Sequence, residues 1–600
     1  MKSLDELQSE YRQTVAKLAR ETLPKANHIV AEGRSFADQI VIGKSRFLDK
    51  FGCSSEAEYK KQCVKDGRIM YHAHIGMNDA EATINALKQI DLVAKENDFR
   101  IDRAGFALDR RMGLPADRRD AQPAETGPML ANHAEWDQLA QCADIQPHMG
   151  DFMIGQPASV INTAHALRAG CTTIGNLSQF FTFEAPGWRD TKFTTVETIK
   201  AIAMLGKLRD RGTLLHSYLE DGYGALFKNC ATIAGWAYLE KYIVEELLGA
   251  KLSHCIGGLT SDPIKRAGWI FALDKIHDGR CVGSMIYGDT ISFNADFTHN
   301  RGVVAEYLLW DILAQMHCPT GHAVLPLPVT EAIRIPSAEE IAEAHCFGHR
   351  IEQSAKRMLP HVDFTAAHLF AEGICADGQR VFENALAGLL DCGVNIRDPL
   401  QMLFVLKRLG PAAFETLFAT SQHNQFPTDM YQLSRRVVDD HHDLFTTVES
   451  KKLLKGRRLL LASSDVHEHA IGALSELLSE AGADVINLGA EQSIDQLMEA
   501  MKHQAIDALL ISTHNGMALD YARQLKVAMD EDEQNMPVVI GGVLNQKVDY
   551  HELPVPVEKE LIALGFHPAL SLPNLPNLLT KFEQSEFKQY RLDQPDDDLG

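Results

Sequence analysis

The chain has 600 residues, of which 45% are hydrophobic and 23% charged, and its formal net charge is −22. These values are ordinary for folded globular proteins, and the length allows for about three to four domains, or fewer where one of them is a barrel. The acidic balance argues against a nucleic-acid or anionic-membrane partner, and no stretch approaches the ~20 apolar residues of a membrane span.

The first segment, residues 1–59, alternates charged and apolar residues with helical spacing and lacks the apolar core of a signal peptide. Eleven cysteines are scattered along the chain without a Cys-x-x-Cys pair. Such an odd, scattered set fits a reducing compartment and argues against disulfides, iron–sulfur clusters and zinc knuckles. We therefore expect a helical N-terminal segment in a cytoplasmic protein.

Residues 60–360 are predicted to form a TIM-like (β/α)8 barrel. Short apolar runs, most of them followed by helix-like segments, alternate through this region, as is typical of a parallel barrel. Residues 361–435 are expected to be helical and to pack on the barrel, and the charged residues 436–456 to form a linker. The eight candidate strands are "RIMYHAH", "RIDRAGFAL", "DFMIG", "TTIGN", "TLLHSY", "LSHCIGG", "VGSMIYG" and "HAVLPLP".

Residues 457–600 have the clearest alternation of strands and helices in the chain. The candidate strands are "RLLLAS", "ADVINLG", "DALLIST" and "MPVVIGG", each followed by a helical pattern. This order predicts a doubly wound, parallel α/β sheet of the Rossmann or flavodoxin type.

Distinctive polar or glycine residues follow three of these four strands. The first strand leads to Ser464, Asp465 and His467, the third ends in "STHNG", and the fourth ends in "GGVLN". Ligands of open α/β sheets bind outside the carboxyl ends of the strands. In an Asp-x-His pair the carboxylate can orient the imidazole as a metal ligand, and paired glycines let a bulky ligand approach the backbone. Each feature taken alone is more often structural.

The combination resembles the cobalamin-binding domain of adenosylcobalamin mutases, above all the small subunit of glutamate mutase, over most of residues 457–590. This resemblance implies adenosylcobalamin as a cobalt-corrinoid cofactor, with His467 as the lower axial cobalt ligand and Asp465 as its orienter. Ala470 and His514 depart from the family pattern, which puts the binding of the nucleotide tail in question. The cofactor-binding residues that the resemblance implies are Ser464, Asp465, Val466, His467, Ser512, Thr513, His514, Gly541 and Gly542.

The barrel region is similar, with gaps, to the large subunit of glutamate mutase over much of residues 95–345. By that resemblance Arg103 in "IDRAGFAL" grips a substrate carboxylate, and Glu184 in "FTFEAPGWRD" contacts the amino group. Glu331 in "LPVTEAIRIPSAEE" would touch the adenosine ribose, and the glycines of "HCIGGLTSD" would lie close to the corrin.

A second carboxylate clamp is missing from this pattern. Where the large subunit has an arginine after its fourth strand, this chain has Asn176, Ser178 and Gln179. We therefore expect a small carboxylic or amino acid with one carboxylate, or with a hydroxyl or amide at its other end, rather than glutamate itself.

The resemblance implies a radical isomerase, either a carbon-skeleton or an amino-group mutase. Its cofactor would split the cobalt–carbon bond homolytically, and the 5′-deoxyadenosyl radical would abstract a hydrogen atom from the substrate. The family also implies a homodimer and a reactivating chaperone as partners.

Two other interpretations remain open from the sequence. One is a metal-dependent hydrolase of the barrel type, because His72 and His74 lie on one face of the first strand and can share a metal. His148, His216 or His254 would complete that site. The other is a corrinoid-dependent methyltransferase or a cobalamin-dependent sensor.

Overall fold

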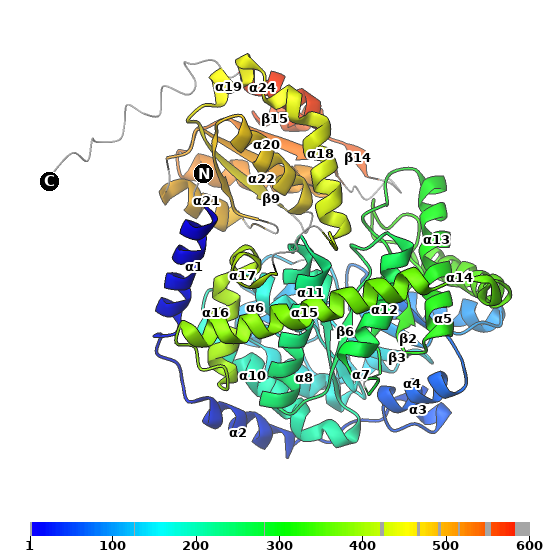
Figure 1. The fold of residues 1–600 in the computed structure, drawn as a ribbon. Helices are drawn as coiled ribbons and strands as arrows, with labels where there is room; N and C mark the ends of the chain where they lie inside the picture. Colours follow the sequence, from blue (N-terminus) through cyan, green and yellow to red (C-terminus); the bar gives the residue numbers. More distant parts are fainter. Residues whose placement is uncertain are drawn as a thin grey trace. The chain divides into compact units, whose positions relative to one another are not determined.

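The computed structural model describes residues 3–124, 126–280, 282–420, 425–464, 468–489, 492, 494–503, 505–513, 516–546 and 554–581. The chain divides into two compact units (Figure 1). The first comprises Met1–Glu331 and Ile335–Asp429, and the second comprises Ala332–Arg334 and Met430–Gly600. No helix within the described ranges has the length and apolar character needed to cross a membrane.

The first unit is built on eight parallel strands in the order β6-β5-β4-β3-β2-β1-β8-β7. A parallel bridge between Ile256 and Ile286 joins the two ends of this sheet, so that it closes into the predicted barrel. The strands are β1 (Met70–Ile75), β2 (Arg103–Phe106), β3 (Gln146–Met149), β4 (Thr173–Ile174), β5 (Leu214–Tyr218), β6 (Leu252–Cys255), β7 (Met285–Ile286) and β8 (Ala323–Val324).

The third predicted barrel strand is wrong. Residues 151–155, "DFMIG", follow the strand instead of forming it, and β3 begins earlier at Gln146. The segment "QPHM" contains a proline and a histidine and has no β-branched residue, so its composition gives no strand signal. All four of its residues are nevertheless buried, and the chain turns directly afterwards, where Phe152 has a φ of 54°.

Helices surround the barrel and cap it. Helix α15 (Thr365–Asp391) packs along α11 (Cys230–Lys241) and α12 (Pro263–Ile276), as Figure 1 shows. Glycines allow this close approach, since a Cβ on Gly235 would lie 2.6 Å from Val381 and one on Gly378 would lie 2.7 Å from Ala234.

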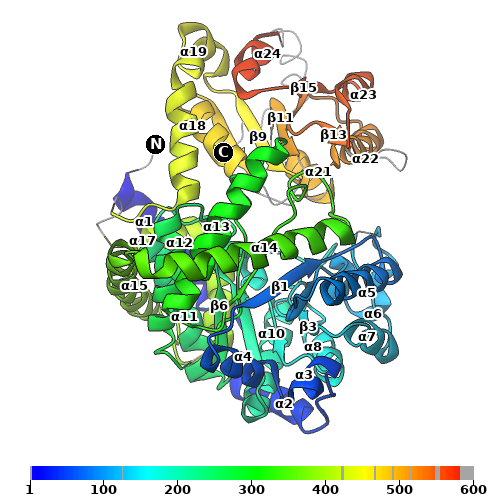
Figure 2. The same ribbon diagram turned by 90° about the vertical axis from the view of Figure 1, so that its right-hand side faces the viewer.

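The other barrel helices follow the strands in chain order (Figure 2). They are α5 (Ala80–Glu96), α6 (Ala116–Arg119), α7 (His133–Ala140), α8 (Ser159–Arg168), α9 (Gln179–Thr182), α10 (Thr191–Leu208), α13 (Phe297–His317) and α14 (Ala338–Met358). The remaining helices of this unit are α1 (Leu4–Leu18), α2 (Ala26–Ala37), α3 (Arg46–Phe51), α4 (Glu56–Lys65), α16 (Pro399–Leu409) and α17 (Pro411–Phe418).

The second unit has a parallel sheet in the order β10-β9-β11-β12-β15. Alternate residues of its strands face different helical layers: Leu459 and Leu461 lie in one core, and Leu460 and Ala462 lie in the other. This is the predicted doubly wound α/β sheet. Its strands are β9 (Arg458–Ser463), β10 (Asp484–Asn487), β11 (Ala508–Thr513), β12 (Val538–Gly542) and β15 (His567–Ala569), and a separate hairpin pairs β13 (Asn545–Gln546) with β14 (Val555–Pro556).

The helices of the second unit include the charged segment 436–456 that we expected to be a linker. Val438, Phe445 and Leu454 on its helices are buried in the core beside Leu459 and Leu461, so burial of these side chains stabilises the helices. The helices are α18 (Asp429–Phe445), α19 (Val448–Leu454), α20 (Glu468–Glu480), α21 (Ile494–His503), α22 (Ala518–Glu531), α23 (Glu558–Ala563) and α24 (Leu575–Lys581).

His345 on α14 makes the stability of the first unit sensitive to pH. Its side chain is fully buried, and neither ring nitrogen has a hydrogen-bond partner within the described part of the chain. Burial, together with the nearby His349, lowers the pKa of His345 to about 3. In the unfolded chain this histidine binds a proton as the pH falls through about 6.5, whereas in the folded chain it stays neutral. The free energy of unfolding therefore decreases as the pH is lowered below about 6.5.

We expect the difference in unfolding free energy between His345→Leu and the wild type to change by about 2 kcal/mol in favour of the variant when the pH is lowered from 6.5 to 5. Urea denaturation followed by tryptophan fluorescence measures this, because all five tryptophans lie in the first unit. A difference between the two proteins that does not change with pH would contradict the prediction.

Candidate functional site

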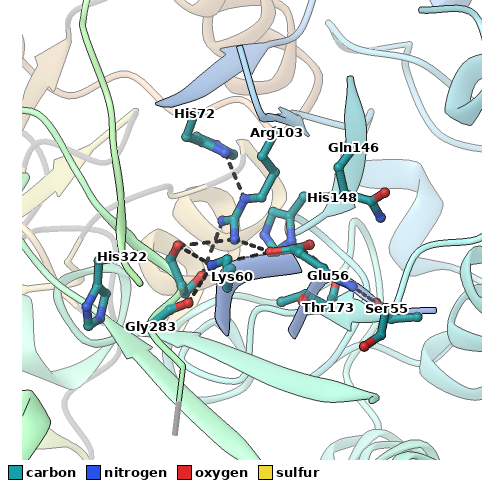
Figure 3. A network of polar contacts seen from close by, with 12 residues as sticks. Ser55, Glu56, Lys60, His72, Arg103, Gln146, His148, Thr173, Gly283 and His322 are labelled. Atoms are coloured by element: carbon teal, nitrogen blue, oxygen red, sulfur yellow. Dashed lines mark hydrogen bonds and ion pairs between the residues drawn. The ribbon is translucent and has the colours of Figure 1, made fainter. Parts of the chain in front are cut away.

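Arg103 is the first residue of β2 and lies at the amino end of the barrel, where Figure 3 shows its guanidinium between His72 and Glu56. Arg103 Nη1 lies 2.9 Å from Glu56 Oε1 of helix α4, and both side chains are buried. Arg103 Nη2 also donates to Ser284 Oγ at 3.2 Å. Arg103, the predicted substrate clamp, thus has a carboxylate partner within the chain. It lies at the amino end of the barrel, whereas barrel enzymes bind substrate at the carboxyl ends of the strands.

Lys60, one turn after Glu56 on α4, completes this buried network. Its Nζ lies 3.3 Å from Glu56 Oε1 and donates to Ser284 O at 2.7 Å and to Gly283 O. Burial alone would raise the pKa of Glu56, but Arg103 and Lys60 outweigh it and hold that pKa below its usual value. Helix α4 and strand β2 therefore bring one buried anion and two buried cations together at this end of the barrel.

The network also fixes the proton on His72. Arg103 Nε donates to His72 Nδ1 at 2.9 Å, and a guanidinium can only donate. Burial, followed by the charge of Arg103, holds the pKa of His72 well below its usual value, so the ring is neutral. His72 therefore carries its proton on Nε2, which is buried and has no partner in the described ranges.

Two further histidines lie beside His72 inside the barrel. The ring centroids of His72 and His148 are 6.0 Å apart, and those of His148 and His216 are 5.2 Å apart. Burial holds the pKa values of His148 and His216 well below the usual value. His148 Nδ1 lies 3.1 Å from Thr173 O and must donate to it, which leaves a lone pair on the buried, unpartnered Nε2.

Polar side chains gather above these rings, where the strands end. His74 on β1 lies 3.8 Å from Asp151, which follows β3. Gln179 Nε2 donates to Asp151 Oδ1 at 3.2 Å and to Asp221 Oδ2 at 3.1 Å, and Asn176 Nδ2 donates to the same Asp221 oxygen at 2.7 Å. Asn176 and Gln179, which stand where the large subunit of glutamate mutase is expected to have an arginine, therefore bind the carboxylates of Asp151 and Asp221.

Tyr287, directly after β7, lies within this group. Its ring stacks on Tyr218 with centroids 5.2 Å apart and planes 9° apart, and its centroid lies 6.0 Å from that of His74. Burial and then the charges of Glu331, Asp151 and Asp221 raise the pKa of Tyr287 well above its usual value. Three carboxylates from different loops therefore converge on one aromatic side chain.

Glu331, predicted to be a site residue, lies after β8 in this part of the barrel. The side chain is half-buried, and desolvation together with Glu340 raises its pKa to about 7. A carboxyl group with such a pKa can hold or release a proton near neutral pH. The structure thus brings Glu331 together with Tyr287, Asp151 and Asp221, none of which we predicted from the sequence.

Glu184, the other predicted residue of the barrel, pairs with Lys407 of α16 at 3.0 Å. The Glu184 side chain is 40% exposed, and its backbone oxygen accepts from Arg110 Nη2 at 3.4 Å. Burial lowers the pKa of Lys407. Glu184 therefore holds a buried cation of its own chain.

The predicted glycine turn after β6 holds a carboxylate. The backbone N–H groups of Gly257 and Leu259 donate to Glu220 Oε2 at 2.6 and 3.1 Å. Gly257 has a φ of 127°, and a Cβ there would lie 2.4 Å from Tyr287 O, so only glycine fits.

Two observations concern the metal site of the hydrolase interpretation. Within the described ranges, no group of three or more His, Cys, Asp or Glu side chains is arranged to hold a metal ion. His254, proposed as a further ligand, instead bonds Glu240 at 3.1 Å and His277 at 2.9 Å.

In the second unit, the predicted cofactor residues lie at the carboxyl ends of adjacent strands. Ser512 pairs with Ser463 on one side and with Gly541 on the other, and Ser464 N donates to Ser512 O at 2.9 Å. The strand order reverses between β9 and β11, the position at which open α/β sheets bind ligands. Asp465, Val466, His467 and His514 lie outside the described residues.

This edge of the sheet fits a large ligand. A Cβ on Gly541 would meet nothing closer than 3.6 Å, and Gly542 has a φ of 95°. Thr513 Oγ1 is buried without a hydrogen-bond partner among the described residues. The edge thus offers open backbone, hydroxyl groups and an unsatisfied polar atom.

Comparison with known protein families identifies this region. The model of the B12 binding domain matches residues 458–552, which include the three strand ends described above. Residues 458–552 are a B12-binding domain. The expected cobalamin-binding domain is therefore confirmed.

Two known relatives match a short part of the chain. A fused isobutyryl-CoA mutase of Paraburkholderia xenovorans is 32% identical over 80 residues, which are 13% of this chain and 6% of that protein. A glutamate mutase sigma subunit of Haloarcula marismortui is 33% identical over 81 residues, which are 14% of this chain and 54% of that protein. The chain thus spans about half of one relative and a small part of the other.

A cobalamin-binding protein from Desulfitobacterium hafniense matches as a solved structure. It is 16% identical, and the match covers 26% of this chain and 81% of that one with a TM-score of 0.18.

Proposed function

We propose that the chain is an adenosylcobalamin-dependent isomerase that rearranges a small carboxylic or amino acid by a radical mechanism. The observation that carries the proposal is the joining of a B12-binding domain to a parallel barrel in one chain. The similarity of a short part of the chain to two mutases supports an isomerase over a methyltransferase or a sensor.

In this proposal, His467 would hold the cobalt and Asp465 would orient the imidazole. Ser464, Ser512 and Thr513 offer hydroxyl groups to the cofactor, and Gly541 and Gly542 leave room for it. When bound, adenosylcobalamin supplies the radical chemistry. The protein provides the binding site for the cofactor and a barrel that keeps water and oxygen from the reacting groups.

The barrel residues would bind and orient the substrate. His74 and Asp151 form a polar pair, and the ring of Tyr287 lies 6.0 Å from that of His74. The charges of Glu331, Asp151 and Asp221 help to raise the pKa of Tyr287. Glu331 can exchange a proton near neutral pH because its pKa is raised to about 7.

Incubation of the purified full chain with adenosylcobalamin and candidate acids tests this function. We expect a shifted visible spectrum of the bound cofactor and release of 5′-deoxyadenosine that depends on the correct substrate. Methyl transfer from methylcobalamin without any 5′-deoxyadenosine would favour the methyltransferase instead.

We also propose that the protein is a cytoplasmic homodimer. In size-exclusion chromatography it should elute with a mass near twice the 66.6 kDa of one chain.

A further inference from the structure

Asp151 is a carboxylate whose charge the chain compensates only in part. Its side chain is 23% exposed, and its contacts are the Gln179 amide at 3.2 Å and the His74 ring at 3.8 Å. Burial raises the pKa of Asp151, although His74 and Gln179 act in the opposite direction. Glu56 shows the contrast, since two cations within the network hold its pKa down. A cationic ligand would supply the counter-charge that Asp151 lacks.

Two buried ring nitrogens point toward the same part of the barrel. His148 Nε2 lies 3.1 Å from the position of a Cβ on Gly150, the residue immediately before Asp151. His72 Nε2 lies 2.7 Å from the position of a Cβ on Gly105, which is paired with His74 in the sheet. Neither nitrogen has a hydrogen-bond partner among the residues that the structure describes, and both rings are at most 1% exposed.

Their proton states make these two nitrogens complementary. His148 Nε2 offers a lone pair and His72 Nε2 offers a proton, as their hydrogen bonds to Thr173 and Arg103 require. One ligand that both donates and accepts could satisfy them together, and a buried polar atom left without a partner costs about 1–3 kcal/mol.

The barrel interior is also unusual because histidine and tyrosine rings, packed against glycines, take the place of branched apolar side chains. Barrels are normally filled by branched apolar residues that pack in layers. Here Gly105 faces the ring of His72, and Gly175 faces that of His216. The upper layer contains His74 and the stacked Tyr218 and Tyr287, whose ring faces can attract a cation.

Nearby arginines have partners in the chain and do not turn this region into an anion site. Arg111 lies 2.7 Å from Asp109, and Arg110 donates to the backbone oxygen of Glu184. Tyr287 has three carboxylates among its charged neighbours, Glu331, Asp151 and Asp221. The negative charge of this region therefore favours a cationic ligand group over a carboxylate of the ligand.

We propose that the barrel binds the ammonium group of a small primary amine between the Asp151 carboxylate and His148 Nε2. His72 Nε2–H then donates to a second polar group of the same ligand. The inference rests on the proposed function in taking this amine to be the substrate of the isomerase. It assigns the amino group to residues other than Glu184, and it excludes a dicarboxylate that lacks an amine.

Three four-carbon probes test the charge preference: butylammonium, 1-butanol and butyrate. Their dissociation constants for the full chain are measured at pH 7.5 by ligand-observed NMR titration, without turnover. We expect butylammonium to bind at least about tenfold more tightly than 1-butanol, and butyrate to bind no better than 1-butanol. Equal affinity for the amine and the alcohol, tighter binding of butyrate, or no binding of the amine would each overturn the proposal.

Matched variants locate the site. Asp151→Asn should weaken butylammonium binding at least about tenfold and leave 1-butanol unchanged, because only the charge is removed. Asp137→Asn, at a carboxylate that is 51% exposed on α7, should change neither constant. An unchanged amine affinity in folded Asp151→Asn would overturn the assignment. If that variant does not fold, the three wild-type constants still decide the matter.

This test separates the inference from the isomerase proposal. If the amine binds as expected and no 5′-deoxyadenosine forms with any amine, the isomerase proposal fails and the ammonium site stands. If 5′-deoxyadenosine forms with an acid that has no amino group, the isomerase stands and the inference fails.

Discussion

Replacing His467 with glycine is expected to weaken the binding of adenosylcobalamin at least about 100-fold and to abolish formation of 5′-deoxyadenosine. The proposed function makes this imidazole the lower ligand of cobalt, and removing a ligand costs more than the 10–100-fold that follows loss of a residue that only orients one. Titration of the full chain with adenosylcobalamin, followed in the visible spectrum, gives the dissociation constants.

Two further variants separate ligation from a general effect of losing a histidine. Asp465→Asn keeps the imidazole and removes only its proposed orienter, so it should weaken binding about 10–100-fold. His442→Ala removes a histidine that is 48% exposed in the same unit and should leave binding unchanged. If His467→Gly kept full affinity for adenosylcobalamin and full turnover, the assignment of His467 as the cobalt ligand would be wrong.

The difference between what the sequence predicted and what it missed follows from the range of the interactions. The cofactor edge of the second unit depends on strands β9, β11 and β12, whose Leu-, Val- and Ile-rich runs are visible locally. Parallel pairing then places Ser512 beside Ser463 and Gly541. In contrast, β15 has three residues, "HPA", and no strand signal of its own.

The barrel site was less predictable because side-chain direction and partner choice depend on distant segments. Arg103 lies 47 positions after Glu56, and only the fold shows that the two meet at the amino end of the barrel. Asp151 was placed inside a strand when it follows one. The sequence did contain a signal for this site, namely position after a strand. Barrels bind substrate at the carboxyl ends of their strands, and such an end lies within three residues before each of Asp151, Asp221 and Tyr287.

The buried network at the amino end predicts a large loss of stability when its single anion is neutralised. Glu56→Gln keeps the shape of the side chain but leaves Arg103 and Lys60 as two buried cations without a counter-charge. Breaking a buried ion pair in this way costs about 3–5 kcal/mol. Arg103→Met should cost less, because Glu56 and Lys60 remain as a neutral pair 3.3 Å apart. Urea denaturation followed by tryptophan fluorescence at pH 7 gives both values for the first unit.

The ranking of these variants tests whether the network supports the fold. Adding Lys60→Met to Glu56→Gln should recover part of the loss, since one buried cation is removed, whereas the exposed Glu58→Gln on the same helix should change little. Because the pKa of Glu56 is lowered in the fold, its contribution is complete above about pH 4.3 and disappears as the pH falls through the lowered value. If Arg103→Met instead left stability unchanged and raised the KM for the substrate, Arg103 would contact the substrate, and the barrel would have to open at its amino end.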